Sequence, residues 1–413
     1  MKRESFRGDM PLCSCKRDCS GMKLGPIYAD NNAVGPKILN YVPEIGVIAP
    51  SCPSDMFEYI ASNQDRGPVA RALRDAIAAT EGVSKESVLV FGSGLEMICK
   101  LPPILKRDTV VAIEGDFFGY RKAASLCELP FVEVPNGLAD LQVSLEAVSR
   151  TLSGLVRPIL YVTLPFLNPY QTKVPLGLVR ELLEHHEDLI VVADCAYRRY
   201  SSPGWMAKSA EQHSRLIYLN VSAKDLGTCG ARISWMVAGK ELRDCISSRL
   251  LPYEIGMPAA RKVTALLQSP RIVERIIMTQ SAASELLREG LETLGFELRT
   301  GSGPWVLVHI GNHAGDIMKT LREEEGVFVQ LQDAIVPSLR GWLRISATVP
   351  CEARAIVRAL ARHAPMKEQP PYDYTGESLG PPAPASDSCV VRHVSPCQEM
   401  ALSSAQGPTG APP

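Results

Sequence analysis

Short, continuous apolar runs recur along the chain before residue 250, and small or polar residues follow each of them. The runs cover residues 87–91, 109–114, 158–165, 189–193 and 216–219. Runs of this length are typical of strands that are buried on both faces of a parallel sheet. Helical patterns separate the runs, so the alternation predicts an α/β fold with a doubly wound, mainly parallel sheet.

The pattern changes in the C-terminal part of the chain. Residues 282–292 have the spacing of a helix, residues 305–310 resemble a strand, and residues 353–363 again have helical spacing. These elements predict a second, smaller α+β domain beside the parallel sheet. We expect the N-terminal segment to join this smaller domain.

The predicted organisation follows from these patterns and from the composition of the two ends. Its parts are a disordered leader over residues 1–25, the N-terminal segment 26–55, a large domain over residues 56–255, a small domain over residues 256–365 and a tail over residues 366–413. The tail is rich in Pro, Gly and Ser, a composition that does not form a packed core, so we predict that it is disordered.

Polar residues stand at the carboxyl ends of three of the predicted strands. Asn168 and Asp194 follow two of the apolar runs, and Lys224 lies just past a third. This edge of an open α/β sheet faces the ligand. Ordinary structural roles remain as alternatives, because aspartate often caps a helix, asparagine before proline often forms a turn, and lysine in a glycine loop is often a surface residue.

Two further segments have the residue types of a phosphate or cofactor site. Gly94 lies in a strand-to-helix turn, where glycine allows a phosphate to approach main-chain N–H groups at a helix N-terminus. The turn lacks the full dinucleotide fingerprint and the P-loop lysine, so it predicts neither of those sites. Phe117 follows another strand, where an aromatic ring either stacks on a cofactor or packs in the core. Arg232, shortly after Lys224, is able to bind a phosphate.

The order and spacing of these residues resemble those of a known family. The matched residues are Asn168, Asp194, Tyr197, Lys224, Arg232 and Arg344. The chain is similar to fold-type I pyridoxal-phosphate enzymes of the class I/II aminotransferase group, nearest to histidinol-phosphate aminotransferases, from about residue 28 to about residue 363. The resemblance implies an aspartate-aminotransferase-like large domain, pyridoxal 5′-phosphate as the cofactor, a small amino-acid-like substrate and a homodimer.

The resemblance also implies three catalytic residues. Lys224 would form a Schiff base with the cofactor and then move the α-proton of the substrate. Asp194 would pair with the protonated pyridine nitrogen, which makes the ring an electron sink. Tyr197, together with Asn168, would hydrogen-bond the phenolic oxygen of the cofactor.

The remaining implied roles concern binding. Phe117 would stack on the pyridine ring. The phosphate would be held by residues of the glycine turn and of the lysine segment, namely Gly94, Leu95, Glu96, Ser222 and Arg232. Arg344 would clamp the α-carboxylate of the substrate with its planar bidentate fork. Asn32, in the N-terminal segment, would lie over the substrate.

Departures from the family pattern affect the expected substrate more than the expected cofactor. The usual Asn-Pro-x-Gly turn reads Asn168-Pro169-Tyr170-Gln171, so the glycine is replaced and a tyrosine stands near Asn168. Ala223 replaces a serine that is often found before the lysine. Tyr59 is a candidate for the tyrosine that commonly reaches the phosphate from a partner subunit, although its surroundings align poorly.

Composition agrees with a cytoplasmic enzyme. The 413 residues carry a net charge of −1, which gives no indication of a nucleic acid or an acidic membrane surface as partner. No apolar run approaches the roughly 20 residues of a membrane helix. The scattered cysteines indicate reduced thiols, and we expect no metal, since Cys13, Cys15 and Cys19 lack a fourth ligand at a familiar spacing.

The sequence thus favours an aminotransferase that acts on an amino acid or an amino-alcohol phosphate. A decarboxylase, cyclase or lyase on the same scaffold remains an alternative, because the cofactor supplies the chemistry and the residues that hold it are shared. A degenerate cofactor-binding protein is a third possibility, which the intact Lys224, Asp194 and Arg232 disfavour.

Overall fold

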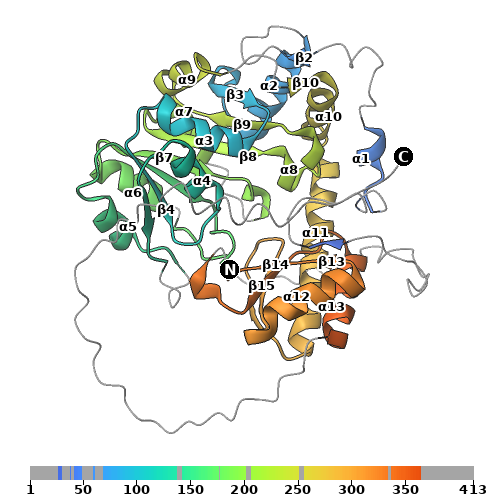
Figure 1. Cartoon of the computed structure of the whole chain (residues 1–413). Coiled ribbons are helices and arrows are strands. Elements are labelled where there is room, and N and C mark those ends of the chain that lie inside the picture. Colours follow the sequence, from blue (N-terminus) through green and yellow to red (C-terminus); the bar gives the residue numbers. More distant parts are fainter. Residues whose placement is uncertain are drawn as a thin grey trace, which may run out of the picture.

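The described part of the chain contains two sheets and the helices that pack on them (Figure 1). The computed structural model describes residues 27–29, 38, 41–48, 59–60, 68–136, 142–175, 177–200, 206–250, 255–333 and 336–363. The predicted leader, the predicted tail and Asn32 lie outside the described residues.

Within the described residues, a seven-stranded sheet forms the larger part. Its spatial order is β3 (Val88–Phe91), β9 (Ser234–Val237), β8 (Leu216–Val221), β7 (Ile190–Asp194), β6 (Pro158–Thr163), β4 (Thr109–Ile113) and β5 (Phe131–Val134). Strands β4 to β8 pair in parallel, whereas β9 is antiparallel to both of its neighbours. The predicted mainly parallel sheet is therefore confirmed.

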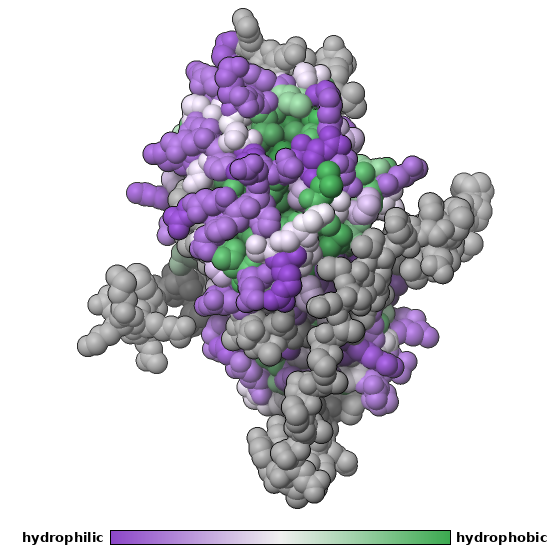
Figure 2. All heavy atoms as spheres, turned by 90° about the vertical axis from the view of Figure 1, so that its left-hand side faces the viewer, coloured by the Kyte–Doolittle hydropathy of each residue, from purple (hydrophilic) through white to green (hydrophobic). Residues whose placement is uncertain are grey.

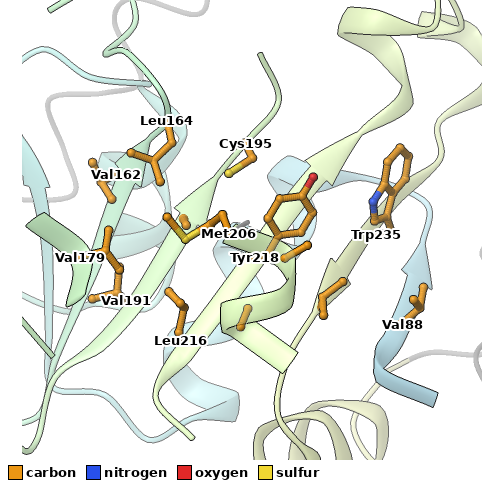
Figure 3. Close-up of a cluster of buried hydrophobic side chains, with 14 of the residues drawn as sticks. Val88, Val162, Leu164, Val179, Val191, Cys195, Met206, Leu216, Tyr218 and Trp235 are labelled. Atoms are coloured by element: carbon orange, nitrogen blue, oxygen red, sulfur yellow. The ribbon is translucent and has the colours of Figure 1, made fainter. Parts of the chain in front are cut away.

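Helices cover both faces of this sheet. One face packs against α2 (Pro68–Glu81), α5 (Leu145–Leu152), α6 (Leu178–His185), α7 (Met206–Gln212) and α10 (Met257–Leu267), and the other against α3 (Gly94–Ile104), α4 (Gly119–Leu126) and α9 (Lys240–Ser247). Neighbouring strand residues point to opposite cores, so Val191 and Val192 of β7 are both fully buried. Figure 3 shows Val191 on one face beside Val179 of α6 and Met206 of α7.

A smaller antiparallel sheet follows in the C-terminal part. Its order is β11 (Glu297–Arg299), β12 (Val306–His309), β15 (Trp342–Ile345) and β14 (Gln330–Leu331). It packs with α11 (Pro270–Thr293), α12 (Ala314–Glu325) and α13 (Pro350–His363). Helix α11 runs from α10 beside the larger sheet to α13 beside the smaller one (Figure 1).

Short N-terminal elements attach to these parts. Strand β1 (Ile27–Tyr28) pairs in parallel with β13 (Val327–Phe328), and β2 (Tyr59–Ile60) pairs with β10 (Ile255–Gly256). The Lys262 ammonium donates to the carbonyl oxygen of Ile45, at 2.8 Å, in α1 (Glu44–Val47). The predicted domain boundaries stay predictions.

Hydrophilic side chains dominate the face that Figure 2 shows, with hydrophobic surface between them over the larger sheet. None of the helices in the described ranges combines the length and the apolar character that a bilayer span requires.

Candidate active site

A cavity of about 470 Å³ lies where β6, β7 and β8 end, and it contains most of the residues that the sequence singled out. Those that line it are Gly94, Leu95, Phe117, Asn168, Asp194, Tyr197, Lys224, Arg232 and Arg344. Glu96 and Ser222 do not line it. Gln330, on β14, also lines the cavity and was not predicted. Side chains of both sheets therefore meet at one site.

Asp194 is the last residue of β7, and its neighbour in register is Thr163 of β6. Its Oδ1 accepts a hydrogen bond from the Ala196 N–H at 3.1 Å, and its Oδ2 accepts one from the Tyr120 hydroxyl at 3.1 Å. Burial raises the pKa of Asp194 to about 6, although these hydrogen bonds and the positive charge of Lys224 act in the opposite direction. The carboxylate thus caps local backbone and also faces the cavity.

Lys224 reaches the cavity because α8 (Ser222–Asp225) directly follows β8. Its Nζ lies 5.9 Å from the centre of the Tyr197 ring. That ring is buried and packs against Trp305, with 5.0 Å between ring centres. The amine, the carboxylate of Asp194 and the ring of Tyr197 therefore converge from successive strand ends.

The N-terminus of α3 forms another wall of the cavity. Ser93 caps this helix: its Oγ accepts the Glu96 N–H at 3.4 Å and the Arg232 guanidinium at 2.8 Å. A Cβ at Gly94 would lie 2.7 Å from Cγ1 of Val221, so glycine is needed for helix α3 to approach β8 this closely. Sequence reasoning missed Ser93, whose signal is a serine directly before a helical segment.

Two buried polar atoms at the site test whether a cofactor fits. Among the described residues, the amide oxygen Oδ1 of Asn168 and the hydroxyl Oγ of Ser222 have no hydrogen-bond partner. A buried polar group without a partner costs about 1–3 kcal/mol, so such a pair calls for an explanation. Ser222 lies between Val221 and Ala223, which line the cavity. The Asn168 amide can donate its N–H groups to a phenolic oxygen, and the Ser222 hydroxyl can donate to a phosphate oxygen, so the two residues fit a ligand that carries both groups.

Arg344 projects from β15 into the cavity and is 6% exposed. Its guanidinium carbon lies 4.7 Å from the centre of a Trp305 ring, and its Nη1 donates to Oε1 of Gln330 at 3.4 Å. Contact with an aromatic face restricts the plane of the guanidinium. Nothing in the sequence indicated that Trp305 contacts Arg344, because Trp305 appears there as one more apolar residue at the start of a predicted strand.

The Asn168 turn is joined to the C-terminal part by several hydrogen bonds. The Gln171 amide donates to the Trp305 carbonyl at 2.7 Å and accepts the Gly303 N–H at 2.7 Å. The Trp305 indole donates to the Pro169 carbonyl at 2.7 Å, and the Tyr170 hydroxyl contacts that of Ser338 at 2.7 Å. These contacts explain the departure from the Asn-Pro-x-Gly pattern. Gln171 has a left-handed backbone, with φ of 57°, which favours glycine, and its side chain adds the hydrogen bonds to Trp305 and Gly303.

We expect Gln171→Gly to lower the free energy of unfolding by about 1–3 kcal/mol, because the two buried main-chain partners lose their bonds while the backbone loses about 1 kcal/mol of strain. Lys106→Gly is the matched control. Lys106 has a similar φ of 52° and an exposed side chain, so its substitution relieves strain alone. Urea unfolding of both variants checks this, and equal shifts for the two would contradict it.

The fold is that of known aminotransferases. Histidinol-phosphate aminotransferase from Sinorhizobium meliloti, solved in complex with pyridoxal-5′-phosphate, matches with a TM-score of 0.68 over 82% of this chain and 90% of that chain, at 17% identity. A mutant of Thermus thermophilus aspartate aminotransferase matches with a TM-score of 0.63 over 82% of this chain and 95% of that chain, at 21% identity. The predicted aspartate-aminotransferase-like fold is confirmed.

Sequence comparison gives the family. The family model "Aminotransferase class I and II" matches residues 66–360, and the chain belongs to this family. Histidinol-phosphate aminotransferase 2 of Gluconobacter oxydans is 25% identical over 285 residues, which cover 68% of this chain and 77% of that protein. The chain is therefore an enzyme of the class I/II aminotransferase family, as the resemblance predicted.

Proposed function

We propose that the protein is a pyridoxal-phosphate-dependent aminotransferase that acts on an amino acid or an amino-alcohol phosphate. The observation that carries this proposal is the single cavity in which Lys224, Asp194 and Arg344 meet. When bound, the cofactor supplies an electron sink for the negative charge that develops at the α-carbon of the substrate. The Asn168 side chain, which lines the cavity and whose amide can donate to a phenolic oxygen, supports its binding at this site.

Different residues of the cavity would have different roles toward such a cofactor. The Lys224 amine would be the covalent attachment point and would move the proton at the α-carbon. The Asp194 carboxylate would accept the N–H of the ring and stabilise its positive charge. Tyr197 and Asn168 would hold the phenolic oxygen, and Phe117 would limit the position of the ring.

The phosphate group would be bound at the N-terminus of α3. The residues assigned to it are Gly94, Leu95 and Arg232, which line the cavity, together with Glu96 and Ser222, which do not line it. Main-chain N–H groups at a helix N-terminus favour an anion, and Arg232 adds a full positive charge. The contact between Arg232 and Ser93 supports this assignment, since it holds the guanidinium beside the helix N-terminus.

Arg344 is assigned to the substrate. We expect Arg344→Lys to weaken amino-acid binding and Arg344→Ala to weaken it further, by about 2–5 kcal/mol, because a buried carboxylate loses its partner. Cofactor attachment to Lys224 should be unchanged. Titration of amino acids against the cofactor absorbance measures the loss.

Arg299 provides the matched control for Arg344. Its guanidinium also stacks on a tryptophan, 5.4 Å from the centre of the Trp342 ring, but Arg299 is not among the cavity-lining residues. Arg299→Ala should leave amino-acid binding intact. If Arg344→Ala lowers the melting temperature and leaves amino-acid affinity intact, Arg344 has a structural role instead.

The reaction type is tested by a single turnover with a panel of amino acids and amino-alcohol phosphates. An aminotransferase releases the matching keto acid or, from an amino-alcohol phosphate, the matching ketone or aldehyde, and it retains the amino group. Mass spectrometry detects both. Release of carbon dioxide or ammonia would indicate the decarboxylase or lyase alternative on the same scaffold.

We also propose that the enzyme is a homodimer in the cytoplasm. The resemblance to dimeric family members is the support for this assembly. Sedimentation equilibrium of the purified protein measures its mass, and a monomer at micromolar concentration with full activity would contradict the proposal.

A further inference from the structure

A buried chain of hydroxyl groups joins Asp194 to a second carboxyl group, that of Asp116. The Tyr120 hydroxyl donates to Oδ2 of Asp194 at 3.1 Å and contacts Oγ1 of Thr163 at 2.8 Å. Thr163 Oγ1 in turn lies 2.7 Å from Oδ1 of Asp116. All four residues are buried, and the resemblance assigned no role to Asp116, Tyr120 or Thr163.

The number of protons in this hydrogen-bonded series of side chains follows from its contacts. It has three oxygen–oxygen contacts, and each needs one proton to be a hydrogen bond. The hydroxyls of Tyr120 and Thr163 supply two. If both carboxyl groups are ionised, one contact at 2.7–3.1 Å joins two oxygens with no proton between them. One additional proton, on either carboxyl group, completes all three bonds.

The surroundings of the two carboxyl groups differ. Asp194 lines the cavity, and the positive charge of Lys224 favours its ionised form. Asp116 does not line the cavity, and its other bonds come from the main-chain N–H groups of Thr163 at 2.9 Å, Asn168 at 3.2 Å and Phe117. The additional proton is therefore better placed on Asp116.

In the described ranges, no Lys, Arg or His side chain forms an ion pair with Asp116 or Asp194, although the positive charge of Lys224 acts on Asp194. The titratable groups that face them are Tyr120 on α4, Lys224 on α8 and the thiol of Cys195 after β7. Burial raises the pKa of both carboxyl groups to about 6. Two such groups joined by hydroxyls titrate as a pair.

We propose that Asp116 is a positioning residue that holds one proton while Asp194 is ionised. The protonated Asp116 donates to Thr163, Thr163 donates to Tyr120, and Tyr120 donates to Asp194. This direction of donation keeps a negative charge on Asp194 at the cavity wall, and Asp116 also accepts the main-chain N–H of Asn168. The consequence for a bound pyridine ring rests on the proposed function, whereas the location of the proton does not.

Infrared spectroscopy of the apoprotein tests the location of the proton. Exposed carboxyl groups are almost fully ionised at pH 6, so a carboxylic-acid C=O band at this pH reports a buried acid. Protein labelled with ¹³C-aspartate should show a shifted band, and Asp116→Asn should remove it. Absence of the band from the labelled wild-type protein overturns the proposal without any variant. Removal of the band by Asp194→Asn, with Asp116→Asn unchanged, overturns it too.

Tyr120→Phe distinguishes the relay from simple burial. Without the Tyr120 hydroxyl, one contact and one proton remain, so Asp116 no longer needs the additional proton. The part of the band that Asp116→Asn removes should then titrate at lower pH in the Tyr120→Phe background. If its midpoint stays unchanged, burial alone protonates Asp116 and the relay is wrong.

The same samples separate this inference from the proposed function. Failure of the proposed function would appear as the absence of a borohydride-reducible link between Lys224 and added cofactor. Failure of the relay would appear as a missing acid band in a protein that still forms this link.

Discussion

Lys224→Ala should lose both the borohydride-reducible cofactor link and turnover, the latter by at least about a thousandfold. The cavity brings one lysine amine, that of Lys224, together with Asp194 and Tyr197 among the residues that line it. Removing this amine removes the attachment point and the group that moves the α-proton. Mass spectrometry after borohydride reduction measures the link, and single-turnover kinetics measure the rate.

Lys240→Ala is the matched control for Lys224→Ala. Lys240 is an exposed lysine in α9 whose ammonium lies 2.7 Å from Oδ2 of Asp244, and its loss should change neither the link nor turnover. Circular dichroism of both variants confirms that they are folded. A reducible adduct on another lysine of the Lys224→Ala protein would show that the attachment point was wrongly assigned.

The larger sheet and the place of the site could be predicted because both follow from local sequence. A strand buried on both faces must be apolar throughout, so β6, β7 and β8 stand out as continuous runs. Their parallel order brings Asn168, Asp194 and Lys224 to one edge of the sheet. The family resemblance then connected these residues with Arg344 of the smaller sheet.

Helix limits were predicted less well. The pattern indicated a helix at residues 282–292, whereas α11 covers Pro270–Thr293. Proline at the first helical position is favourable there, since its missing N–H would have no partner in the helix. Helix α3 continues through Pro102 and Pro103, residues that in a sequence favour a helix end.

Contacts between distant residues could not be predicted from the sequence. The Trp305 ring under Arg344, the Gln171 amide on the main chain of Gly303 and the Tyr120 hydroxyl on Asp194 each join segments far apart in the chain. Their residue types have no periodic or local signal, because the geometry depends on how the two sheets and their helices pack. The detailed geometry of the site therefore depends on packing that the sequence does not show.

Asp194→Asn should give an apoprotein that is at least as stable as the wild type at pH 7–8 but turns over about a hundredfold to a thousandfold more slowly. The rate falls because an amide cannot stabilise positive charge on the ring, and a preorganised electrostatic interaction of this kind is worth a few kcal/mol. Single-turnover proton loss from the α-carbon measures the effect, with cofactor binding retained.

The stability prediction follows from the pKa of Asp194, which burial raises from 3.8 to about 6. Between these pH values the folded protein binds more protons than the unfolded chain, so the free energy of unfolding falls as the pH rises through this interval. Asn at this position does not titrate. The variant should lose that part of the pH dependence, and urea unfolding from pH 4 to pH 8 measures it.

Asp333→Asn separates this prediction from a role in capping. The Asp333 carboxylate also accepts a main-chain N–H, that of Gly341 at 2.7 Å, but Asp333 is not among the cavity-lining residues. Its substitution should cost at most about 1–2 kcal/mol of stability and leave turnover unchanged. If Asp194→Asn behaves in the same way, with normal turnover and a lower free energy of unfolding, the only role of Asp194 is to accept hydrogen bonds that stabilise the fold. A slow but stable Asp194→Asn protein would instead mean that the buried Asp194 carboxylate lowers the free energy of unfolding but is required for turnover.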